Sequence, residues 1–246
     1  MSTNNIPKKL IDEKGRRVDG RTVEELRPIK LEVGVLNNTD GSAYVEFGRN
    51  KILVGVFGPR EAHPKRIILS DRAVIRCRYR MAPFSVEERK NPAPSRREVE
   101  ISKVIREALE PAIMSEYYPR TTIDVFIEIL QSDGGSRCAS IIGSSLALAD
   151  AGIPMRDLVS SCSVGKADGK IVLDLSDMED KYGEADMPLA YMPNFNYITL
   201  LQMDGELSLN EFNKGLEMAI EACKKIHEIQ KETLKEKYQK IQKKGE

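Results

Sequence analysis

Long apolar runs are missing from this sequence, and their absence bears on where the protein works. No stretch approaches the roughly 20 consecutive apolar residues that a membrane-spanning helix requires. The polar start, MSTNNIPKKL, also lacks the apolar core of a secretory signal. We therefore expect a cytoplasmic protein that makes no contact with a membrane.

Cysteine and histidine are scarce as well. The four cysteines, Cys77, Cys138, Cys162 and Cys223, are widely spaced and form no CxxC pair. This spacing favours buried thiols in a reducing compartment over zinc ligands. Because the chain has only two histidines, it supports no Ser/His/Asp or Cys/His catalytic arrangement.

An excess of either charge is missing too, since 38 basic and 38 acidic side chains give a formal net charge of zero. Any attraction for a polyanion therefore has to come from local clusters of charge. The 246 residues, 41% of them hydrophobic, suffice for a full-sized core without a disulfide or a structural metal. No low-complexity linker interrupts the chain, so we treat residues 1–246 as a single domain.

Hydrophobic patterning predicts an α+β protein in which mixed and antiparallel sheets pack with helices. Alternating apolar residues and turn signals predict strands at 29–36, 42–47, 51–57, 72–81, 121–131, 189–192 and 197–203. Asp-Gly pairs at 168–169 and 204–205 predict hairpin turns. Capping boxes at Ser95 and Ser208 open helices, the second a long C-terminal helix to about Lys243, and a small-residue helix spans 136–150.

Basic side chains gather between residues 76 and 97. Arg76, Arg78 and Arg80 share one face of a predicted strand, and Arg96 and Arg97 fall in the first turn of the following helix. Two cations at a helix N-terminus are unfavourable by about 0.3–1 kcal/mol, a placement that makes sense if an anion also binds there. Charge alone favours the alternative, a solvated surface balanced by nearby glutamates.

The segment Gln131-Ser-Asp-Gly-Gly-Ser-Arg137 joins a predicted strand to a predicted helix. Its glycines let backbone amides approach a ligand, and the helix start offers free N–H groups and its positive end to a phosphate. Ser136 and Arg137 add a hydroxyl donor and a charged donor. The spacing is not that of a Walker P-loop, and a Gly-Gly turn that serves geometry alone is the alternative.

Acidic residues gather between 174 and 186, in what we expect to be a loop between two strands. Converging carboxylates can hold Mg²⁺ or Mn²⁺ through a few oxygens, or one of them can deliver a proton to a leaving oxygen. Six acids cannot all be ligands, so an ordinary acidic surface is the alternative. The six are Asp174, Asp177, Glu179, Asp180, Glu184 and Asp186.

Five separated segments resemble the RNase PH family and occur in the family's order along nearly the whole chain. They are VDGRTVEELRPI, GPREAHP, RKNPAPSRRE, EILQSDGGSRCASIIGSSLALADAGIP and DLSDMEDKYGEADMP. RKNPAPSRRE is more similar to the catalytic ring subunit of the archaeal exosome than to bacterial RNase PH. In this light the glycine loop and the acidic run, each ambiguous alone, support each other.

The resemblance implies an RNase PH-like fold and a phosphate-dependent 3′-to-5′ exoribonuclease. Such an enzyme releases nucleoside 5′-diphosphates, and its reverse reaction adds 3′ tails. The resemblance also implies a hexameric ring in which catalytic subunits alternate with non-catalytic RNase PH-like subunits. A cap of S1/KH-type RNA-binding proteins would lie over the pore, through which RNA enters as a single strand.

Individual roles follow from motif position. The resemblance makes Asp180 the catalytic carboxylate and Asp186 its companion, and both would hold the Mg²⁺ or Mn²⁺. Related polynucleotide phosphorylases have a lysine at the metal two residues after the second aspartate, whereas this chain has Pro188. Inorganic phosphate, the co-substrate, would be held by Arg97, Gly135, Ser136 and Arg137. Candidates for contact with the RNA backbone are Lys65, Arg76 and Arg96.

Other functions remain open at this point. A non-catalytic RNA-binding ring subunit is one, because this fold is used both ways and fold alone does not settle function. Asp180 together with Ser136 and Arg137 argues against it. A stand-alone homohexameric RNase PH that trims transfer RNA 3′ ends is another. A hydrolytic nuclease is a third, which a requirement for phosphate would exclude.

Overall fold

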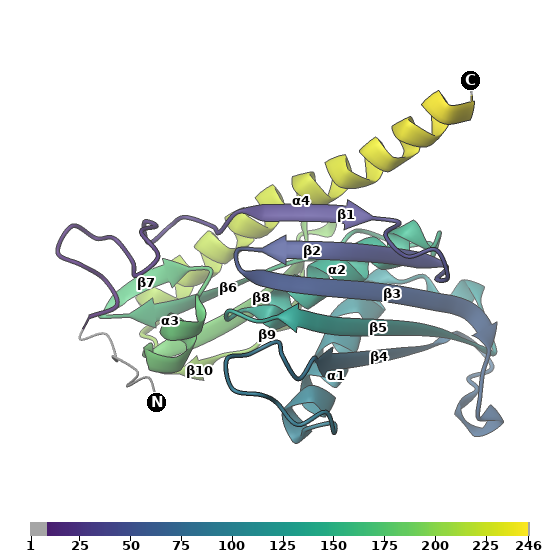
Figure 1. Cartoon of the computed structure of the whole chain (residues 1–246), viewed down its shortest axis with the longest axis horizontal. Helices are drawn as coiled ribbons and strands as arrows, with labels where there is room; N and C mark the ends of the chain where they lie inside the picture. The colour runs from purple at the N-terminus through teal and green to yellow at the C-terminus, as the bar shows by residue number, and fades with distance from the viewer. Residues whose placement is uncertain (1–8, 246) are drawn as a thin grey trace.

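Two five-stranded sheets and four α-helices make up residues 9–245, the part of the chain that the computed structural model describes (Figure 1). The first sheet has the order β1 (Ile29–Val33), β2 (Gly41–Phe47), β3 (Asn50–Glu61), β5 (Thr121–Gln131), β4 (Val74–Met81). The second has the order β10 (Asp204–Gly205), β8 (Ala185–Met192), β6 (Ser160–Ala167), β7 (Lys170–Leu173), and β9 (Tyr197–Leu201) also pairs with β8. The helices are α1 (Arg96–Leu109), α2 (Ser136–Asp150), α3 (Asp177–Tyr182) and α4 (Leu209–Gly245). Short 3₁₀ turns are η1 (Lys65–Ile67), η2 (Glu110–Ala112), η3 (Ser115–Tyr117) and η4 (Pro193–Phe195).

The first sheet begins as the predicted antiparallel meander of β1, β2 and β3. Strand β4 then joins the far edge parallel to β5, because α1 forms the crossover between them. The predicted alternation of β4 is confirmed. Ile75 and Tyr79 are buried, whereas Arg76 and Arg78 on the opposite face are exposed.

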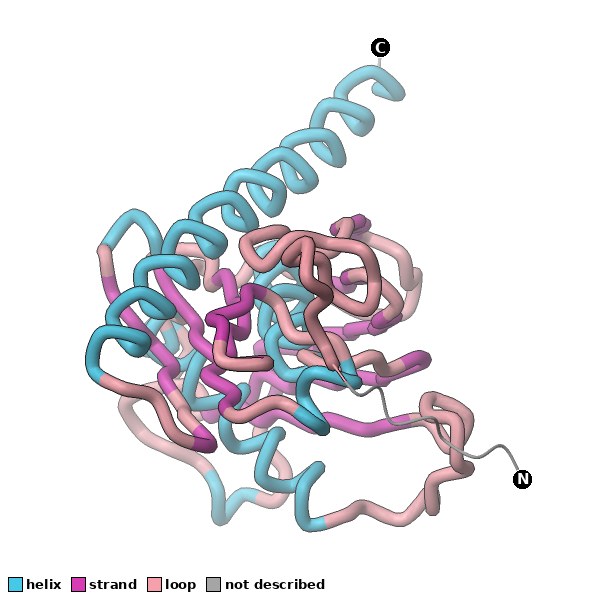
Figure 2. The backbone as a smooth tube through the Cα atoms, turned by 90° about the vertical axis from the view of Figure 1, so that its left-hand side faces the viewer, coloured by secondary structure: helices cyan, strands magenta, loops and turns pink. Residues whose placement is uncertain are grey.

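Helix α2 forms the centre of the molecule. Its small residues let it contact β2 and β3 of the first sheet and β6 and β8 of the second. Every residue from 138 to 148 is buried, so the helix is covered on all sides. The edge-on view in Figure 2 shows helix between the two groups of strands. Because α2 is fixed from both sides, its N-terminus is a rigid support for whatever binds there.

Two predicted turns have different outcomes. The hairpin at Asp168-Gly169 is confirmed and joins β6 to β7. The hairpin turn predicted at Asp204-Gly205 is wrong: these residues form β10 and pair with Asp186 and Ala185 of β8. Pairing with the open edge of β8 outweighs the local preference of an Asp-Gly pair for a tight turn.

The prediction that the acidic run is a loop is also partly wrong, because residues 177–182 form the helix α3. The Glu179 carboxylate accepts hydrogen bonds from the backbone N–H and the hydroxyl of Ser176, at 2.9 and 2.8 Å. These contacts fix the first turn of the helix. As a result, the acids of the run point in different directions.

The long C-terminal helix is confirmed. The predicted capping box opens it, with Ser208 N–H donating to Glu211 and Glu211 N–H donating to the Ser208 hydroxyl, at 2.8 and 3.3 Å. The helix packs on β6, β7 and β1, and its last turns extend beyond the sheets (Figure 1). None of the helices described within residues 9–245 has an apolar stretch that could cross a membrane.

The cysteines are free thiols, as predicted. Cys138, Cys162 and Cys223 are buried, and Cys77 is partly buried. Burial raises the pKa of the Cys77 and Cys138 thiols to about 12, so they stay protonated near neutral pH. One hydrophobic cluster includes residues from both sheets, α1, α2 and α4. The single domain over 1–246 stays a prediction.

Candidate functional site

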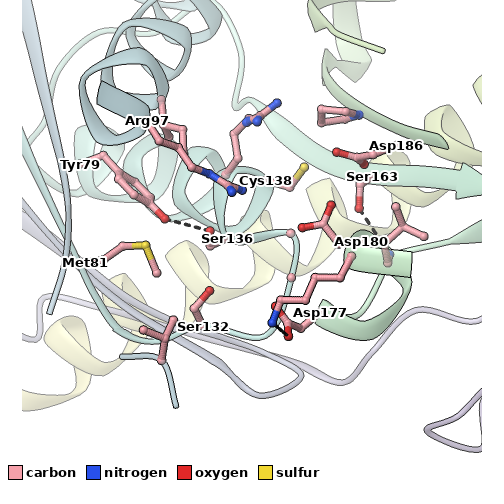
Figure 3. A pocket seen from close by; sticks show the side chains of 18 of the residues that line it. Tyr79, Met81, Arg97, Ser132, Ser136, Cys138, Ser163, Asp177, Asp180 and Asp186 are labelled. Carbon is pink, nitrogen blue, oxygen red and sulfur yellow. Dashed lines mark hydrogen bonds and ion pairs between the residues drawn. The ribbon is translucent and has the colours of Figure 1, made fainter. Parts of the chain in front are cut away.

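A cavity of about 400 Å³ opens where the first turns of α1 and α2 face α3 and β8 (Figure 3). An adjoining hollow of about 630 Å³ shares Arg97, Arg137, Asp180 and Asp186 with it. The structure thus brings together all the residues predicted for the phosphate and the catalytic carboxylates, although they come from four different elements. They are Arg97, Gly135, Ser136, Arg137, Asp180 and Asp186.

The glycine loop is shaped by close packing against α3. Gly134 and Gly135 have φ angles of +67° and +65°, in the left-handed region where a side chain adds strain. A Cβ atom at Gly134 would lie 2.6 Å from the backbone nitrogen of Asp177. Asn50 holds the loop from the other side by accepting from Asp133 N–H and donating to the Gly134 carbonyl, at 2.7 and 2.6 Å. The start of α2 is therefore locked against the start of α3.

A buried ion pair joins the N-terminal segment to this loop. Arg27 donates to both carboxylate oxygens of Asp174 and to the carbonyl of Asp133, the last at 2.5 Å. Burial lowers the pKa of Arg27, but the hydrogen bonds and charge of Asp174 outweigh it and raise the pKa overall. Arg21 also donates to Asp174, at 3.1 Å. Asp174 is thus a structural anion and no candidate ligand.

Glu179 is the second acid of the run with a structural role. It forms a fully buried ion pair with Arg17. Burial raises the pKa of Glu179, yet the hydrogen bonds from Arg17 and Ser176 hold it below its usual value. Because Glu179 precedes Asp180, the pair with Arg17 also fixes where Asp180 lies. The acidic run therefore divides into buried anchors and acids that line the cavity.

The basic side of the cavity consists of hydrogen-bond donors, two of them arginines. In Figure 3 the Arg97 side chain points toward Ser136. The Ser136 hydroxyl lies 2.9 Å from that of Tyr79, a buried residue of β4. Arg137 donates to the side-chain carbonyl of Gln202 at 2.5 Å. With the N-terminus of α2, this side is suited to an anion.

Asp180 and Asp186 form the acidic side. Asp180 lines the cavity. Burial raises the pKa of its carboxyl, and the charge of Arg97 reduces this rise. Burial raises the pKa of Asp186 to about 6, and the neighbouring Asp180 and Asp204 contribute to the rise. The charge of Asp180 opposes ionisation of Asp186, so Asp186 takes up a proton more readily than an isolated aspartate.

The carboxylate pair also fits a hard divalent cation. Mg²⁺ is commonly held by one or two carboxylates and keeps several waters. A dication between Asp180 and Asp186 would relieve the repulsion that helps to raise the pKa of Asp186. Within the described ranges, no three His, Cys, Asp or Glu side chains form a metal-binding group. Asp180 and Asp186 would thus supply two protein ligands, and water or substrate oxygens would have to complete the coordination of a bound cation.

None of the three residues predicted to contact RNA lines this cavity. Arg76 forms an ion pair with Asp124, its partner in the parallel register of β4 and β5, with Nη2 to Oδ2 at 2.6 Å. Lys65 lies in η1 with 77% of its side chain exposed. Arg96 is exposed at the start of α1. Their role toward RNA stays a prediction.

Sequence patterns missed two residues of the site. Tyr79 lies on the apolar face of its strand, where alternation predicts only a core residue. Gln202 lies between β9 and β10 and belongs to no motif. An isolated polar residue beside a predicted strand carries no signal that could have identified it. Both are recognised only from their contacts with Ser136 and Arg137.

A helix terminus rich in anion donors that faces paired carboxylates defines a protein suited to phosphoryl transfer. Comparison with known families supplies the particular class. Residues 25–154 match the family described as 3′ exoribonuclease family, domain 1, and residues 157–222 match domain 2 of the same family. The chain belongs to this family, the RNase PH family.

Curated relatives cover most of the chain. It is 65% identical to the exosome complex component Rrp41 of Thermococcus onnurineus over 233 residues, 95% of this chain and 94% of that protein. It is 57% identical to the protein of that name from Cenarchaeum symbiosum over 229 residues, 93% of this chain and 94% of that protein.

Solved structures share the fold at lower identity. Rice Rrp46 has a TM-score of 0.78 at 23% identity, covering 89% of this chain and 100% of that chain. A chain from the Archaeoglobus fulgidus exosome with RNA bound to the active site has a TM-score of 0.77 at 23% identity, covering 87% and 92%. These neighbours confirm the predicted RNase PH-like fold.

Proposed function

We propose that this chain is the catalytic subunit of an exosome ring and degrades RNA from the 3′ end by phosphorolysis. The observation that carries the proposal is the single cavity in which Arg97, Ser136 and Arg137 face Asp180 and Asp186. One side suits an attacking phosphate and the other a leaving oxygen. Membership of the 3′ exoribonuclease family and high identity to proteins named Rrp41 support the same function.

Inorganic phosphate is the nucleophile in this proposal. The N-terminus of α2 at Gly135, with Ser136, Arg137 and Arg97, holds it beside the last phosphodiester of the RNA. A phosphate oxygen forms a bond to the terminal phosphorus while the bond from that phosphorus to the O3′ of the preceding nucleotide breaks. Fixed positive charge stabilises the charge on the phosphoryl oxygens. The product is a nucleoside 5′-diphosphate, and the reverse reaction adds 3′ tails.

The carboxylates serve the leaving group. When no cation is bound, the released O3′ takes up a proton from Asp180, whose raised pKa supports this role. Asp180 and Asp186 would hold Mg²⁺ or Mn²⁺ in their ionised forms; the bound cation would supply positive charge beside the phosphoryl oxygens, and the proton for O3′ would then come from water. Pro188 lines the cavity where related enzymes have a lysine, so this side carries no side-chain cation at that position.

The assembly is the other part of the proposal. Relatives named as exosome components support a place in a multi-subunit exosome. We infer from the family resemblance a hexameric ring with a non-catalytic RNase PH-like partner, under a cap of S1/KH-type RNA-binding proteins. Single-stranded RNA would reach the site past Lys65, Arg96 and Arg76, whose exposed charges suit a phosphate backbone. We place this activity in the cytoplasm.

The test is degradation of a 5′-labelled single-stranded RNA by the full chain, alone and with its ring partner, with and without phosphate. We expect shortening only with phosphate, and release of nucleoside diphosphates. Asp180→Ala should abolish shortening but retain RNA binding, because it removes the leaving-group carboxylate. Glu221→Ala is the control, since it removes an exposed carboxylate of α4 whose ion-pair partner in the described part of the chain is Lys224, at 2.6 Å.

The outcomes separate the competing functions. RNA that is bound but never shortened, even in the assembled ring, would make this a non-catalytic ring subunit. Release of nucleoside monophosphates without added phosphate would make it a hydrolase. An active ring formed by this chain alone would favour a stand-alone RNase PH.

A further inference from the structure

Among the described residues, Gln202 is the one whose side chain forms a hydrogen bond with the Arg137 guanidinium. We propose that Gln202 is a positioning residue that orients Arg137 toward phosphate without neutralising its charge. This inference rests on the proposed function. Gln202 lies between β9 and β10, and its own backbone N–H donates to the Pro188 carbonyl at 3.2 Å. Its side chain lines the hollow that Arg137, Asp180 and Asp186 share.

The neutrality of this contact sets Arg137 apart from the buried arginines of the fold. Arg17, Arg21 and Arg27 are buried, and each forms an ion pair with a carboxylate. Among the described side chains, those of residues 9–239, Arg137 has no carboxylate oxygen within 4 Å, although it lies in a cavity that Asp180 and Asp186 also line. An amide oxygen accepts its hydrogen bond and leaves the full positive charge for an incoming anion.

An unsatisfied donor points to the same ligand. The Nε–H of Arg137 is buried and has no hydrogen-bond partner in the described part of the chain. A buried donor without a partner is costly, and such groups are rare unless a ligand or water completes them. Gln202 holds Nη1 while Nε stays unpaired, so the guanidinium keeps donors for an oxyanion. Inorganic phosphate supplies negatively charged oxygens that can accept these hydrogen bonds.

Position 202 therefore has two separable requirements. A side chain there has to reach Nη1 of Arg137, and it has to carry no negative charge. Gln202→Glu keeps nearly the same shape but places a carboxylate where the amide oxygen now lies, 2.5 Å from Nη1. Gln202→Leu removes the acceptor and adds no charge. A merely packing role would predict the opposite order, because Glu fits the space of Gln and Leu does not.

The experiment measures the KM for inorganic phosphate and kcat for the full chain in the assembly in which the wild type shortens RNA. Gln202→Glu should raise the phosphate KM roughly tenfold or more, because the new ion pair competes with the anion for the guanidinium. Gln202→Leu should lower kcat and raise the phosphate KM less. Gln239→Glu makes the same chemical change at an exposed site on α4 and should change neither constant.

A second readout does not depend on catalysis. Inorganic phosphate should raise the melting temperature of the wild type, and Gln202→Glu should reduce this rise several-fold. If the wild type is phosphorolytic but Gln202→Glu keeps the wild-type phosphate KM and the wild-type phosphate-induced rise in melting temperature, Gln202 does not position Arg137 and the proposed function stands. If the wild type never shortens RNA, the proposed function fails and the melting measurement decides the role of Gln202. If Gln202→Glu does not fold, Gln202→Leu provides the test: a smaller phosphate-induced rise in melting temperature than in the wild type supports the role of Gln202, and an equal rise overturns it.

Discussion

The charge on Asp186 carries a cost in folding that its removal should recover. Burial raises the pKa of Asp186 from 3.8 to about 6, with further contributions from Asp180 and Asp204. At 1.36 kcal/mol per pKa unit, a rise of that size means that the ionised Asp186 lowers the free energy of unfolding by at most about 3 kcal/mol relative to the protonated form. The folded-state pKa lies above the unfolded-state value, so the protonated carboxyl adds stability that is fully present below pH 3.8. This stability is lost as the pH rises through about 6.

Asp186→Asn should therefore be more stable than the wild type at about pH 7.5, by at most about 3 kcal/mol. The advantage should shrink as the pH is lowered from there toward 4, because the wild-type carboxyl then takes up its proton. Urea unfolding in the presence of a chelator measures both variants across this range. Asp177→Asn is the control, since it removes a partner of Lys181 in a surface ion pair and should change stability by about 0.5 kcal/mol or less.

Mg²⁺ extends the same measurement to the metal. A cation held by Asp180 and Asp186 would stabilise the wild type at neutral pH, and Asp186→Asn should lose most of that stabilisation. Equal stability of the wild type and Asp186→Asn at about pH 7.5 without divalent cations would refute the buried-charge reasoning. Equal stabilisation of both variants by Mg²⁺ would refute the assignment of Asp186 to the metal.

Two further predictions concern the phosphate side. Tyr79→Phe removes the hydroxyl that lies 2.9 Å from the Ser136 hydroxyl. Phosphate titration should then show a phosphate KM raised about fivefold with little change in kcat. An unchanged phosphate KM would contradict a role of Tyr79 in positioning Ser136. Gly134→Ala should lower kcat at least tenfold, because its Cβ atom would meet the backbone of Asp177 at 2.6 Å and separate the loop from α3. Gly169→Ala is the control, because Gly169 also has a positive φ, of +72°, but an added Cβ atom there would have no neighbour within 4 Å. This variant should keep the wild-type kcat. An equal loss of kcat in both variants would count against the argument that Gly134 is required by its packing on α3.

The phosphate side could be predicted from sequence because its signals are local. The strand before the loop, the two glycines and the small-residue helix after it are adjacent in the chain. Their predicted bounds, 121–131 and 136–150, match β5 and α2. A helix terminus forms from neighbouring residues, so patterns of a few residues are enough to place it.

The acidic side could be predicted only in part. Asp174 and Glu179 look like the other acids of the run, and only their contacts with Arg27 and Arg17 identify them as structural. Those partners lie about 150 residues away, and no periodicity connects them. The family resemblance selected Asp180 and Asp186, whereas composition favoured a solvated surface. Similarly, the pairing of Asp204 with Asp186 depends on the open edge of β8, which the local Asp-Gly signal does not reveal.

The site lies between the two halves of the chain. Arg97, Ser136 and Arg137 belong to the part that matches the first family domain, and Asp180 and Asp186 belong to the part that matches the second. A growing polypeptide that has reached only residue 154 possesses the groups for the nucleophile and lacks those for the leaving oxygen. Under the proposed function, nuclease activity therefore begins only after the remainder has been synthesised and has folded against the first half.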